Sequence, residues 1–579
     1  MKKNYLLLLG FFILLALSGL KAQTVVKTVD GVPQFIKFNN KKSAAFRNQA
    51  KALLHEYLPV TKDDRFVKIA SHTDNIGYVN DKYQQYFKNI KVEYAVYNVH
   101  AKNNAVKSMN GEFLKIKKLN TTPGISEKDA LQKALRYVGA DKYMWEDKGN
   151  EAFAWKTEKS KTFYPKGELV IVKNFKATGK LTHGLPVLAY KFNIYAQKPL
   201  SRAWIYVDAH TGKIVHTNDI IKDFNSESSL SGSRATENFF SPTASFYSPE
   251  VTANAATRYS GSRSIETQLS GSSYVLHDVT RGNGIFTYNM LTGTNYSAAV
   301  EFTDNDNNWT AAEYDNAAKD NAALDAHWGA EMTYDYWSQK HGRNSYDGNG
   351  TSIKSYVHYD VAYDNAYWNG SVMTYGDGSD TYFDALTALD VCGHEIGHAV
   401  CSSTANLTYS DESGAMNEGL SDIWGASIEY FAAPEKQTWL IGEDIERRVG
   451  HVALRSMSDP KSEGQPDTYK GTNWYTGTAD NGGVHTNSGV LNHWYYLLSV
   501  GGTGTNDLGN SYSVTGININ VASDIVWRME SVYMTANSTY ADARSYSIQA
   551  ATDLYGSTSN QVQQTTNAWY AVGVGNAYG

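Results

Sequence analysis

The first 224 residues alternate between strand-like and helical spacing. Apolar and polar residues alternate at 83–87 and again at 92–100, which is typical of paired strands. A capped helical pattern follows at 126–138, and strand-like runs return at 185–191 and 203–213. This part of the chain is therefore expected to mix strands with helix.

In the rest of the chain, the spacing of apolar residues changes from strand-like to helical. Residues from about 257 to 386 are rich in Tyr, Thr, Gly and Asn with short alternating runs, which predicts mostly strands and loops. Helical spacing follows, as at 489–499 and 541–554. Between the two halves, residues 225–254 are rich in Ser, Thr and Ala without sustained periodicity, which indicates a linker. The chain as a whole is expected to be α+β.

The N-terminus has the pattern of an export signal. Lys2 and Lys3 precede the apolar run 5–17, and Leu20-Lys21-Ala22 fits a cleavage site before Gln23. We therefore expect residues 1–22 to be a signal peptide and the protein to be secreted. An uncleaved anchor is the alternative, although the apolar run is short for a membrane span, and no other stretch is long enough for one.

Charge divides the chain sharply. Residues 1–230 carry 37 Lys and Arg against 20 Asp and Glu, whereas residues 231–579 carry 16 against 39, so the net charges are +17 and −23. Nucleic-acid binding is not expected, because the lysines are dispersed and no recognition motif accompanies them. The split instead suggests that a basic N-terminal half docks on an acidic C-terminal half. At 579 residues, with 42% hydrophobic and 13% aromatic residues, two to four domains with sizeable cores are expected.

Residues 394–398 read His-Glu-Ile-Gly-His. On a helix, His394 and His398 project from one face about 5–6 Å apart, so both imidazoles can reach one ion. A catalytic zinc takes three protein ligands and keeps one open position. Glu418, on a second predicted helix, can complete the set and leaves Glu395 free as a base. An ordinary surface helix is the alternative, since the motif alone is a moderate signal.

Only two cysteines occur, Cys392 and Cys401. Nine helical residues separate them by about 13.5 Å, beyond the roughly 7 Å limit for a disulfide. We therefore expect two small buried apolar residues, with a thiolate zinc ligand as the alternative. Bound calcium becomes the candidate stabiliser of an exported protein.

The chain resembles the thermolysin family of neutral metallopeptidases. Matching blocks in family order are 280–286, 365–370, the HEIGHAV segment, 417–422, 454–460 and 481–489. The resemblance implies a β-rich lobe with the active-site helix at 257–400 and an α-helical lobe at 401–579. It further implies that His394, His398 and Glu418 bind one catalytic zinc ion and that Glu395 is the general base.

The basic half resembles the propeptides of this family. Residues 23–120 are similar to the fungalysin/thermolysin propeptide motif, and 121–224 resemble the PepSY-like part that follows it. Residues 225–256 are then the linker and the expected processing zone. The resemblance implies that the propeptide acts as an intramolecular chaperone and inhibitor, so that the enzyme is made as an inactive precursor.

Further catalytic roles are implied by the same resemblance. Tyr409 and His485 would stabilise the oxyanion of the tetrahedral intermediate, and Asp480 would orient His485 and favour its charged form. A purely structural histidine is the alternative for His485. The residues that would hydrogen-bond to the zinc-binding imidazoles are Asp422 and Asn417.

The substrate-binding residues are also implied by the family match. Asn365, the Ala366 backbone and Arg455 would hold the peptide backbone, since an arginine can bind a carbonyl by charge-assisted hydrogen bonds. The pocket for the residue after the scissile bond would be lined by Val391, Ile441, Ile445 and Leu454. All four are apolar, which favours cleavage before large apolar residues, although each could equally be plain core.

Calcium is expected at one or two sites. Asp390, Glu429 and Glu443 correspond to family ligands, and carboxylates suit this ion. Thr438 stands where an acidic ligand is expected, so one ion rather than a pair is predicted there. The second site is a surface loop with Asp304, Asp306 and Asn308, for which a polar turn is the alternative.

These observations predict a secreted zinc endopeptidase that acts on proteins and peptides and has no membrane span once its signal is removed. The alternatives come from two other functional classes: an inactive relative serving as a binding or adhesion protein, and a secreted peptidase inhibitor. An inactive relative is expected to lack at least one of His394, Glu395, His398, Glu418 and His485, and all five are present.

Overall fold

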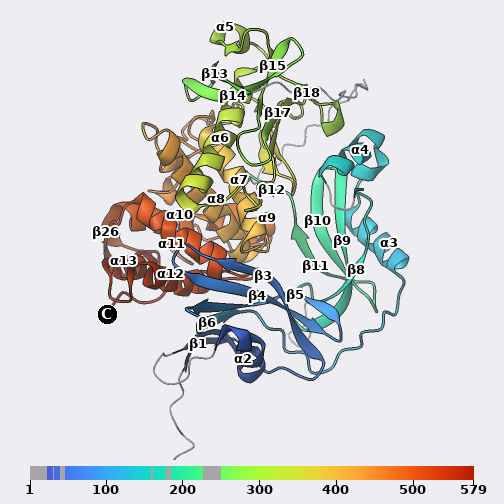
Figure 1. The fold of residues 1–579 in the computed structure, drawn as a ribbon, viewed down its shortest axis with the longest axis vertical. Helices are drawn as coiled ribbons and strands as arrows, with labels where there is room; N and C mark the ends of the chain where they lie inside the picture. Colours follow the sequence, from blue (N-terminus) through green and yellow to red (C-terminus); the bar gives the residue numbers. More distant parts are fainter. Residues whose placement is uncertain (1–22, 30, 39–45, 158–160, 178–183, 226–249) are drawn as a thin grey trace, which may run out of the picture. The chain divides into compact units, whose positions relative to one another are not determined.

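The computed structural model describes residues 23–29, 31–38, 46–157, 161–177, 184–225 and 250–579. The chain divides into two compact units (Figure 1). The first contains residues 1–123, 169–174 and 179–188, and the second contains 124–168, 175–178 and 189–579. The expected signal peptide, 1–22, and most of the expected linker, 226–249, lie outside the described residues.

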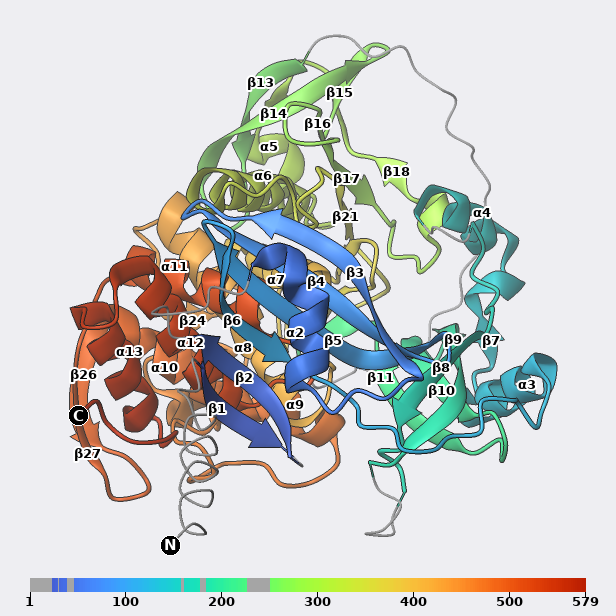
Figure 2. The same cartoon turned by 60° about the horizontal axis from the view of Figure 1, so that its bottom comes forward.

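The first unit is a sheet with one helix packed on it. Its strands are β1 (Gln23–Val29), β2 (Val32–Phe38), β3 (Asp64–Thr73), β4 (Tyr78–Phe87), β5 (Ile90–Lys102), β6 (Ala105–Gly111) and β8 (Glu168–Lys173). Tyr83 pairs with Tyr97 across β4 and β5, so the strands expected at 83–87 and 92–100 are confirmed. The 3₁₀ turn η1 (Arg47–Gln49) precedes helix α2 (Ala50–Tyr57), whose Leu53 and Leu54 join the core beneath it (Figure 2).

The second unit begins with a helix on an antiparallel sheet. Its first elements are α3 (Glu127–Val138), β7 (Lys142–Tyr143), η2 (Met144–Glu146), α4 (Lys148–Thr157), β9 (Pro186–Lys198), β10 (Ser201–Asp208) and β11 (Ile214–Asp219). The Ser126 hydroxyl caps α3 by accepting a hydrogen bond from the Asp129 amide at 3.1 Å. Gly139 ends the helix in the left-handed conformation, with φ 66°. The helix expected at 126–138 is therefore confirmed.

Two further sheets form the strand-rich region. One has the order β12 (Lys222–Asp223), β22 (Ala366–Trp368), β23 (Met373–Tyr375), β21 (Ile353–Val357), β17 (Ile285–Asn289) and β16 (His277–Asp278), with β18 (Val300–Glu301) paired to β17. The other has the order β19 (Thr303–Asp304), β15 (Ser273–Val275), β14 (Ser262–Ser270), β13 (Glu250–Ala256) and β20 (Asn308–Trp309). Strand β13 thus occupies residues that the sequence assigned to the linker.

One long helix was missed in this region. α6 (Asn321–His341) follows the turns η3 (Tyr296–Ala298) and α5 (Ala311–Tyr314) and contacts β17, β21 and helix α7. Fourteen of its 21 residues are buried, and they include polar side chains such as Asp325, His327 and Glu331. Because the helix is covered on most sides, it lacks the apolar stripe that would have revealed it.

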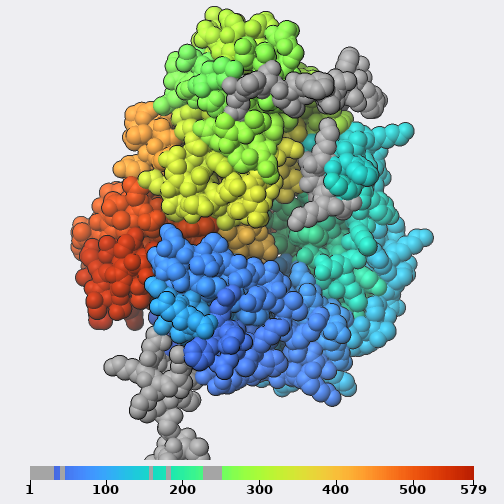
Figure 3. Space-filling model, in the orientation of Figure 1, coloured from blue at the N-terminus to red at the C-terminus, as the bar shows by residue number. Residues whose placement is uncertain are grey.

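The remainder is mainly helical, and its last part forms a continuous surface in orange to red in Figure 3. Its elements are α7 (Leu389–Ser403), α8 (Asp411–Ala432), β24 (Leu440–Ile441), β25 (Arg455–Ser456), η4 (Pro460–Glu463), α9 (Asp480–Asn487), α10 (Gly489–Val500), β26 (Gly501–Thr505), β27 (Ser511–Thr515), α11 (Ile519–Arg528), the π-helical turn η5 (Met529–Tyr533), α12 (Tyr540–Tyr555) and α13 (Asn560–Ala571). The helices expected at 489–499 and 541–554 are confirmed as α10 and α12. No helix among the described residues is both long and apolar enough to cross a membrane.

Within the second unit, an aromatic cluster joins residues 124–168 and 189–225 to the strand-rich region. Phe153 stacks on Tyr296 with ring centroids 5.2 Å apart, and Tyr195 and Ile221 belong to the same buried cluster as Tyr367. Arg202 adds a hydrogen bond of 3.0 Å to the Asn369 carbonyl. These two parts of the second unit therefore share a hydrophobic core.

Candidate active site

Two helices that carry the HEIGH and NEGLSD motifs pack unusually closely. A Cβ atom on Gly393 of α7 would lie 3.0 Å from the Gly425 Cα of α8, and one on Gly397 would lie 3.0 Å from the Ser421 Cα. Glycine is needed at such positions because a side chain would push the two backbones apart. The close approach brings Glu418 of α8 to the two imidazoles of α7.

The three expected zinc ligands converge. His394 Nε2 lies 3.5 Å from Glu418 Oε2, and His398 Nε2 lies 3.4 Å from Glu418 Oε1. Tetrahedral ligands bonded at about 2.0–2.1 Å are separated by about 3.4 Å, so the spacing fits a zinc ion. Both Nε2 atoms and Glu418 Oε2 are buried without a hydrogen-bond partner, which also fits a metal centre.

Each imidazole is oriented through its other nitrogen. His394 Nδ1 donates to Asp422 Oδ1 at 2.8 Å, and His398 Nδ1 donates to Asn417 Oδ1 at 2.7 Å. Ser421 Oγ lies 3.0 Å from the same His398 nitrogen. A proton on Nδ1 leaves Nε2 with a free lone pair, which is the form that binds a metal.

Glu395 lies at the same place without serving as a ligand in the cluster. Its carboxylate is fully buried, and neither oxygen has a hydrogen-bond partner. Burial raises the pKa of Glu395 well above its usual range, although the neighbouring His394 opposes the shift. A carboxyl group in this setting can both accept a proton and return it.

His485 and Tyr409 approach the cluster from outside the two helices. His485 Nδ1 donates to Asp480 Oδ1 at 2.6 Å, and its Nε2 lies 3.3 Å from the Tyr409 hydroxyl. Burial opposes charge on His485, yet the carboxylates of Glu418 and Asp480 raise its pKa to about 10. Burial raises the pKa of Tyr409, so its hydroxyl stays protonated and donates to Glu418. Two donors therefore point toward the cluster.

The expected backbone-binding residues all contact one segment of the chain, residues 223–225. Asn365 Nδ2 donates to the Asn225 carbonyl at 3.0 Å, and the Ala366 carbonyl accepts from the Phe224 amide at 2.9 Å. Arg455 Nη1 donates to the Phe224 carbonyl at 2.9 Å. The sequence analysis did not identify this segment, because a short extended run such as Lys222-Asp223-Phe224-Asn225 carries no local pattern.

Arg455 is itself held by the residue that orients His394. Its Nε and Nη2 donate to the two oxygens of Asp422 at 2.8 and 2.7 Å, and Asn492 donates to the same carboxylate at 2.7 Å. The pair is almost completely buried. One carboxylate therefore positions both a metal ligand and a group that binds a peptide carbonyl.

Phe224 lies beside one of the residues expected to line the apolar pocket, Leu454, since both side chains border Gly442. Val391, Ile441 and Ile445 are fully buried, and Leu454 lies beside Gly442. The Phe224 ring is also fully buried and packs against Gly442, where an added Cβ atom would lie 3.4 Å from two of its ring carbons. It meets the His394 ring edge-on with centroids 5.0 Å apart.

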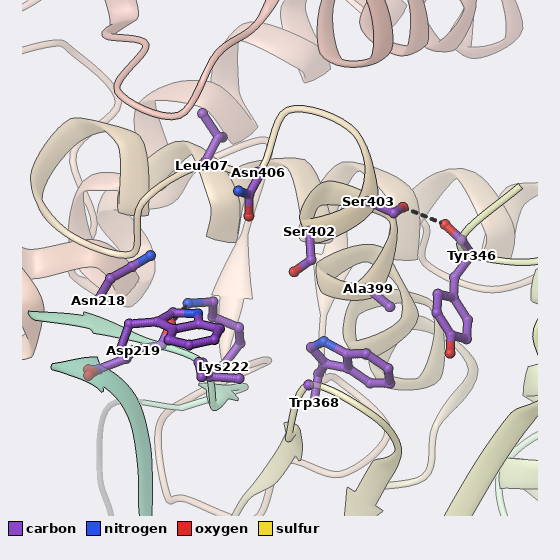
Figure 4. Close-up of a pocket in the computed structure, with 13 residues that line it drawn as sticks. Asn218, Asp219, Lys222, Tyr346, Trp368, Ala399, Ser402, Ser403, Asn406 and Leu407 are labelled. Carbon is purple, nitrogen blue, oxygen red and sulfur yellow. Dashed lines mark hydrogen bonds between the residues drawn. The ribbon is translucent and has the colours of Figure 1, made fainter. Parts of the chain in front are cut away.

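A small cavity adjoins this segment at Lys222 (Figure 4). Its volume is about 250 Å³. Asn218, Asp219 and Lys222 line one side, and Trp368 lies with the end of α7 on the other. The zinc-ligand cluster is not among the lining residues, so the cavity lies beside the candidate centre rather than at it.

A second cluster of potential metal ligands lies farther along α8. Among the described residues, groups of three or more His, Cys, Asp or Glu ligand atoms within 4.8 Å of one another occur at His394, His398 and Glu418 and at Glu429, Glu443 and Asp444. Asp444 was not among the expected ligands. Burial is the largest cause that raises the pKa of Glu429 and Glu443, and repulsion from the Asp390 carboxylate is the next largest. Asp390 therefore lies close to this group. Its own Oδ2 accepts from the Gly442 amide at 2.5 Å.

The acidic surface loop has a different hydrogen-bond pattern. Asp304 Oδ1 accepts from the amides of Asp306 and Asn308 at 3.0 and 3.2 Å, and Tyr314 donates to Asp304 Oδ2 at 3.2 Å. Asp306 Oδ1 also accepts from the Asn308 amide at 3.0 Å. These bonds are those of a polar turn, the alternative that the sequence left open.

Comparison with known proteins agrees with this geometry. The thermolysin metallopeptidase catalytic domain matches residues 252–402, the thermolysin metallopeptidase α-helical domain matches 405–574, and the fungalysin/thermolysin propeptide motif matches 64–113. The chain is 37% identical over 519 residues to thermolysin of Alicyclobacillus acidocaldarius subsp. acidocaldarius, which covers 88% of this chain and 86% of that relative. It is 45% identical over 315 residues to bacillolysin of Bacillus cereus, which covers 54% and 53%.

A solved structure is also similar. The precursor of protealysin, a metalloproteinase from Serratia proteamaculans, is 29% identical, with a TM-score of 0.42 over 50% of this chain and 87% of that chain. The sequence match to thermolysin extends over most of both proteins, and the converged His394, His398 and Glu418 lie within the matched domains. The chain therefore belongs to the thermolysin family of neutral zinc metalloendopeptidases and carries the propeptide motif of that family.

Proposed function

We propose that this metalloendopeptidase holds one catalytic zinc ion on His394, His398 and Glu418 and uses Glu395 as its general base. The observation that carries the proposal is the convergence of buried ligand atoms that lack a hydrogen-bond partner beside an equally unpartnered carboxylate. When bound, zinc polarises the scissile carbonyl and lowers the pKa of water. Glu395 accepts the proton of the attacking water and delivers it to the leaving amine.

His485 and Tyr409 stabilise the negative charge that develops on the scissile carbonyl oxygen. His485 is suited to this task because both of its nitrogens face acceptors, which favours the doubly protonated, charged ring. Asp480 positions the ring. Asp422 and Asn417 fix the orientation of the two zinc-binding imidazoles.

Substrates bind in an extended conformation along β22. Arg455, Asn365 and the Ala366 carbonyl hold the substrate backbone, as they hold residues 224–225 in this structure. The pocket of Val391, Ile441, Ile445 and Leu454 accepts the side chain after the scissile bond, so cleavage occurs before large apolar residues. A change of one methylene shifts such a preference by about 1–3 kcal/mol.

Calcium is proposed as a structural ion. Glu429 and Glu443 have buried carboxylate oxygens without hydrogen-bond partners, so an ion there would relieve both desolvation and mutual repulsion. Asp390 completes the expected set, and Asp444 extends it. The Asp304, Asp306 and Asn308 loop is the weaker candidate, since one oxygen of each carboxylate already accepts hydrogen bonds from amides.

The protein is proposed to be secreted as a precursor after removal of residues 1–22. Residues 23–120 and 121–224 form the propeptide, which assists folding and inhibits the enzyme, and residues 225–256 link it to the lobes at 257–400 and 401–579. Protein and peptide substrates are the expected partners. Support for inhibition comes from the backbone-binding groups, which are engaged by residues 223–225.

The test is hydrolysis of casein by the purified mature protein with and without a zinc chelator. Activity should disappear on chelation and return with added zinc. A protein that stays inactive after complete propeptide removal and zinc addition would instead be the alternative that the sequence left open, an inactive binding or inhibitor protein.

A further inference from the structure

The segment that crosses the active site is extended and pairs with β22, as substrates are proposed to do. Strand β12 pairs antiparallel with β22, with Lys222 opposite Trp368 and Asp223 opposite Tyr367. Beyond β12, the Asn225 amide donates to Asn365 Oδ1 at 3.0 Å, and Asn365 Nδ2 donates back to the Asn225 carbonyl at 3.0 Å. The extended run therefore continues through the whole backbone-binding site.

The hydrogen bonds identify which peptide bond faces the catalytic groups. His485 Nε2 donates to the Asp223 carbonyl at 2.8 Å, and Arg455 donates to the Phe224 carbonyl at 2.9 Å. In the proposed mechanism, His485 binds the carbonyl oxygen of the residue before the scissile bond, and Arg455 binds the carbonyl oxygen of the residue after it. The bond between Asp223 and Phe224 therefore occupies the reactive position.

The side chain after that bond fits its pocket. Phe224 is a large apolar residue, fully buried against Gly442 and the His394 ring, and the Arg455 guanidinium lies 4.8 Å from its ring centre. This is the side-chain class that the apolar pocket was expected to accept. Backbone contacts and side-chain contacts thus agree on the same register.

We propose that the Asp223–Phe224 peptide bond is the bond at which this enzyme first cleaves its own precursor, an inference that rests on the proposed function. One water molecule is consumed. Its oxygen joins the Asp223 carbonyl carbon, and the bond from that carbon to the Phe224 nitrogen breaks. Glu395 transfers one proton of the water to the Phe224 nitrogen, which leaves a new carboxyl end at Asp223 and a new amino end at Phe224.

This position differs by a few residues from the processing zone expected at 225–256, and it has a structural consequence. The fragment that ends at Asp223 would still share the aromatic cluster of Phe153, Tyr195 and Tyr296 with the strand-rich region. Cleavage alone would therefore not release the propeptide. The first cut and the loss of inhibition become separate events.

The experiment measures the masses of the first fragments formed. The full-length precursor and its Glu395→Gln variant are produced in parallel with zinc, and samples are taken from the earliest time points for intact-mass analysis. We expect the first propeptide fragment to end at Asp223 and its partner to begin at Phe224, whereas the Glu395→Gln precursor stays intact. The propeptide end is the decisive reading, because later trimming of the mature N-terminus leaves it unchanged.

Matched substitutions check the register. Phe224→Leu should be cut at the same bond at a rate within about tenfold of wild type, whereas Phe224→Asp should slow this cut by about 100-fold, since the pocket is apolar. Phe240→Asp, in the segment where the sequence predicts processing, should have no effect on the first cut. Thermal unfolding of each variant in the Glu395→Gln background confirms that it folds, and the wild-type masses decide the question even if a variant does not.

The outcomes separate this inference from the proposed function. A first propeptide fragment with any other end, in a protein that digests casein in a Glu395-dependent manner, overturns the Asp223–Phe224 assignment alone. Cleavage after Asp223 in the Glu395→Gln precursor would assign the cut to another peptidase and also overturn it. Loss of both casein hydrolysis and self-cleavage in the zinc-loaded wild type would overturn both proposals together.

Discussion

Helix α8 contributes to two clusters of potential metal ligands, one fully buried and one partly buried, that are built in opposite ways. In the first, His394 and His398 are each held through Nδ1, and Glu418 accepts from Tyr409, so the ligand atoms are fixed by the protein itself. In the second, neither oxygen of Glu429 has a hydrogen-bond partner, and the carboxylates face one another. The first cluster is preorganised by hydrogen bonds, whereas the second brings acidic groups together without such bonds, which is the basis for the proposed calcium ion.

The acidic cluster of Glu429, Glu443 and Asp444 also has a cationic neighbour, Lys436. The Lys436 ammonium pairs with the Asp444 carboxylate. Burial lowers the pKa of Lys436, but the attraction of Asp444 and other nearby carboxylates outweighs burial, so the pKa is raised. The side chain thus supplies one permanent positive charge at the edge of the acidic cluster. One calcium ion, rather than a pair, stays the prediction for this site, where Thr438 stands in place of the expected acidic ligand. Loss of the first ion should therefore abolish function, and loss of the second should lower stability.

The largest effect is expected from Glu395→Gln. The base is lost while all three zinc ligands remain, so kcat should fall by about 10²–10⁴-fold with one zinc still bound per chain. Peptide hydrolysis and metal analysis of the same preparation measure both quantities. Near-normal activity, or loss of the zinc, would contradict the separation of base from ligands.

His485→Ala should come next. Removing one oxyanion donor lowers kcat by about 10²–10³-fold, and KM should change much less because the bond strengthens mainly as charge develops. Initial rates over a range of peptide concentrations separate the two constants. A change confined to KM would make His485 a substrate-binding residue instead.

Calcium removal should act on stability rather than on chemistry. At a calcium concentration one hundred times Kd, an ion bound only by the folded state stabilises it by about 2.7 kcal/mol. The melting temperature of the Glu395→Gln enzyme, which cannot digest itself, should therefore rise with calcium at fixed zinc.

Two substitutions localise that response. Glu429→Gln should abolish most of the calcium-dependent rise, whereas Glu435→Gln, at an exposed position outside the cluster, should leave it intact. A melting temperature indifferent to calcium would remove Asp390, Glu429 and Glu443 from the ligand set.

The smallest effect should come from Asn417→Ala. Loss of the hydrogen bond to His398 weakens zinc binding by about 10–100-fold in comparable sites. The lower end is expected here, because Ser421 Oγ already lies 3.0 Å from the same nitrogen. Competition with a zinc-binding dye measures the change, and an unaltered affinity would show that Ser421 alone is sufficient.

The sequence predicted the ligands well because their geometry is local. The i, i+4 spacing in HEIGH and the helical setting of Glu418 need only the two helices to meet, and Gly393 and Gly397 allow them to do so. Phe224 was missed for the opposite reason. Phe224 reaches Arg455 across 231 residues, and no local period marks such a contact.

The charge split illustrates a different limit. It predicts electrostatic docking of the two halves, and this stays a prediction for the chain as a whole. Within the second unit, however, residues 124–168 and 189–225 meet the strand-rich region through stacked rings such as Phe153 on Tyr296. Net charge reports how segments attract over distance, whereas the contact itself depends on shape and apolar area, which a count of charges does not contain.

The two cysteines have a practical consequence. Both are buried, free thiols on α7, as expected from their helical spacing, and the whole chain contains no others. The native state therefore contains no disulfide bond. Its formation requires neither an oxidising compartment nor a disulfide isomerase. A reducing host cytoplasm should therefore leave the same two free thiols as production outside the cell.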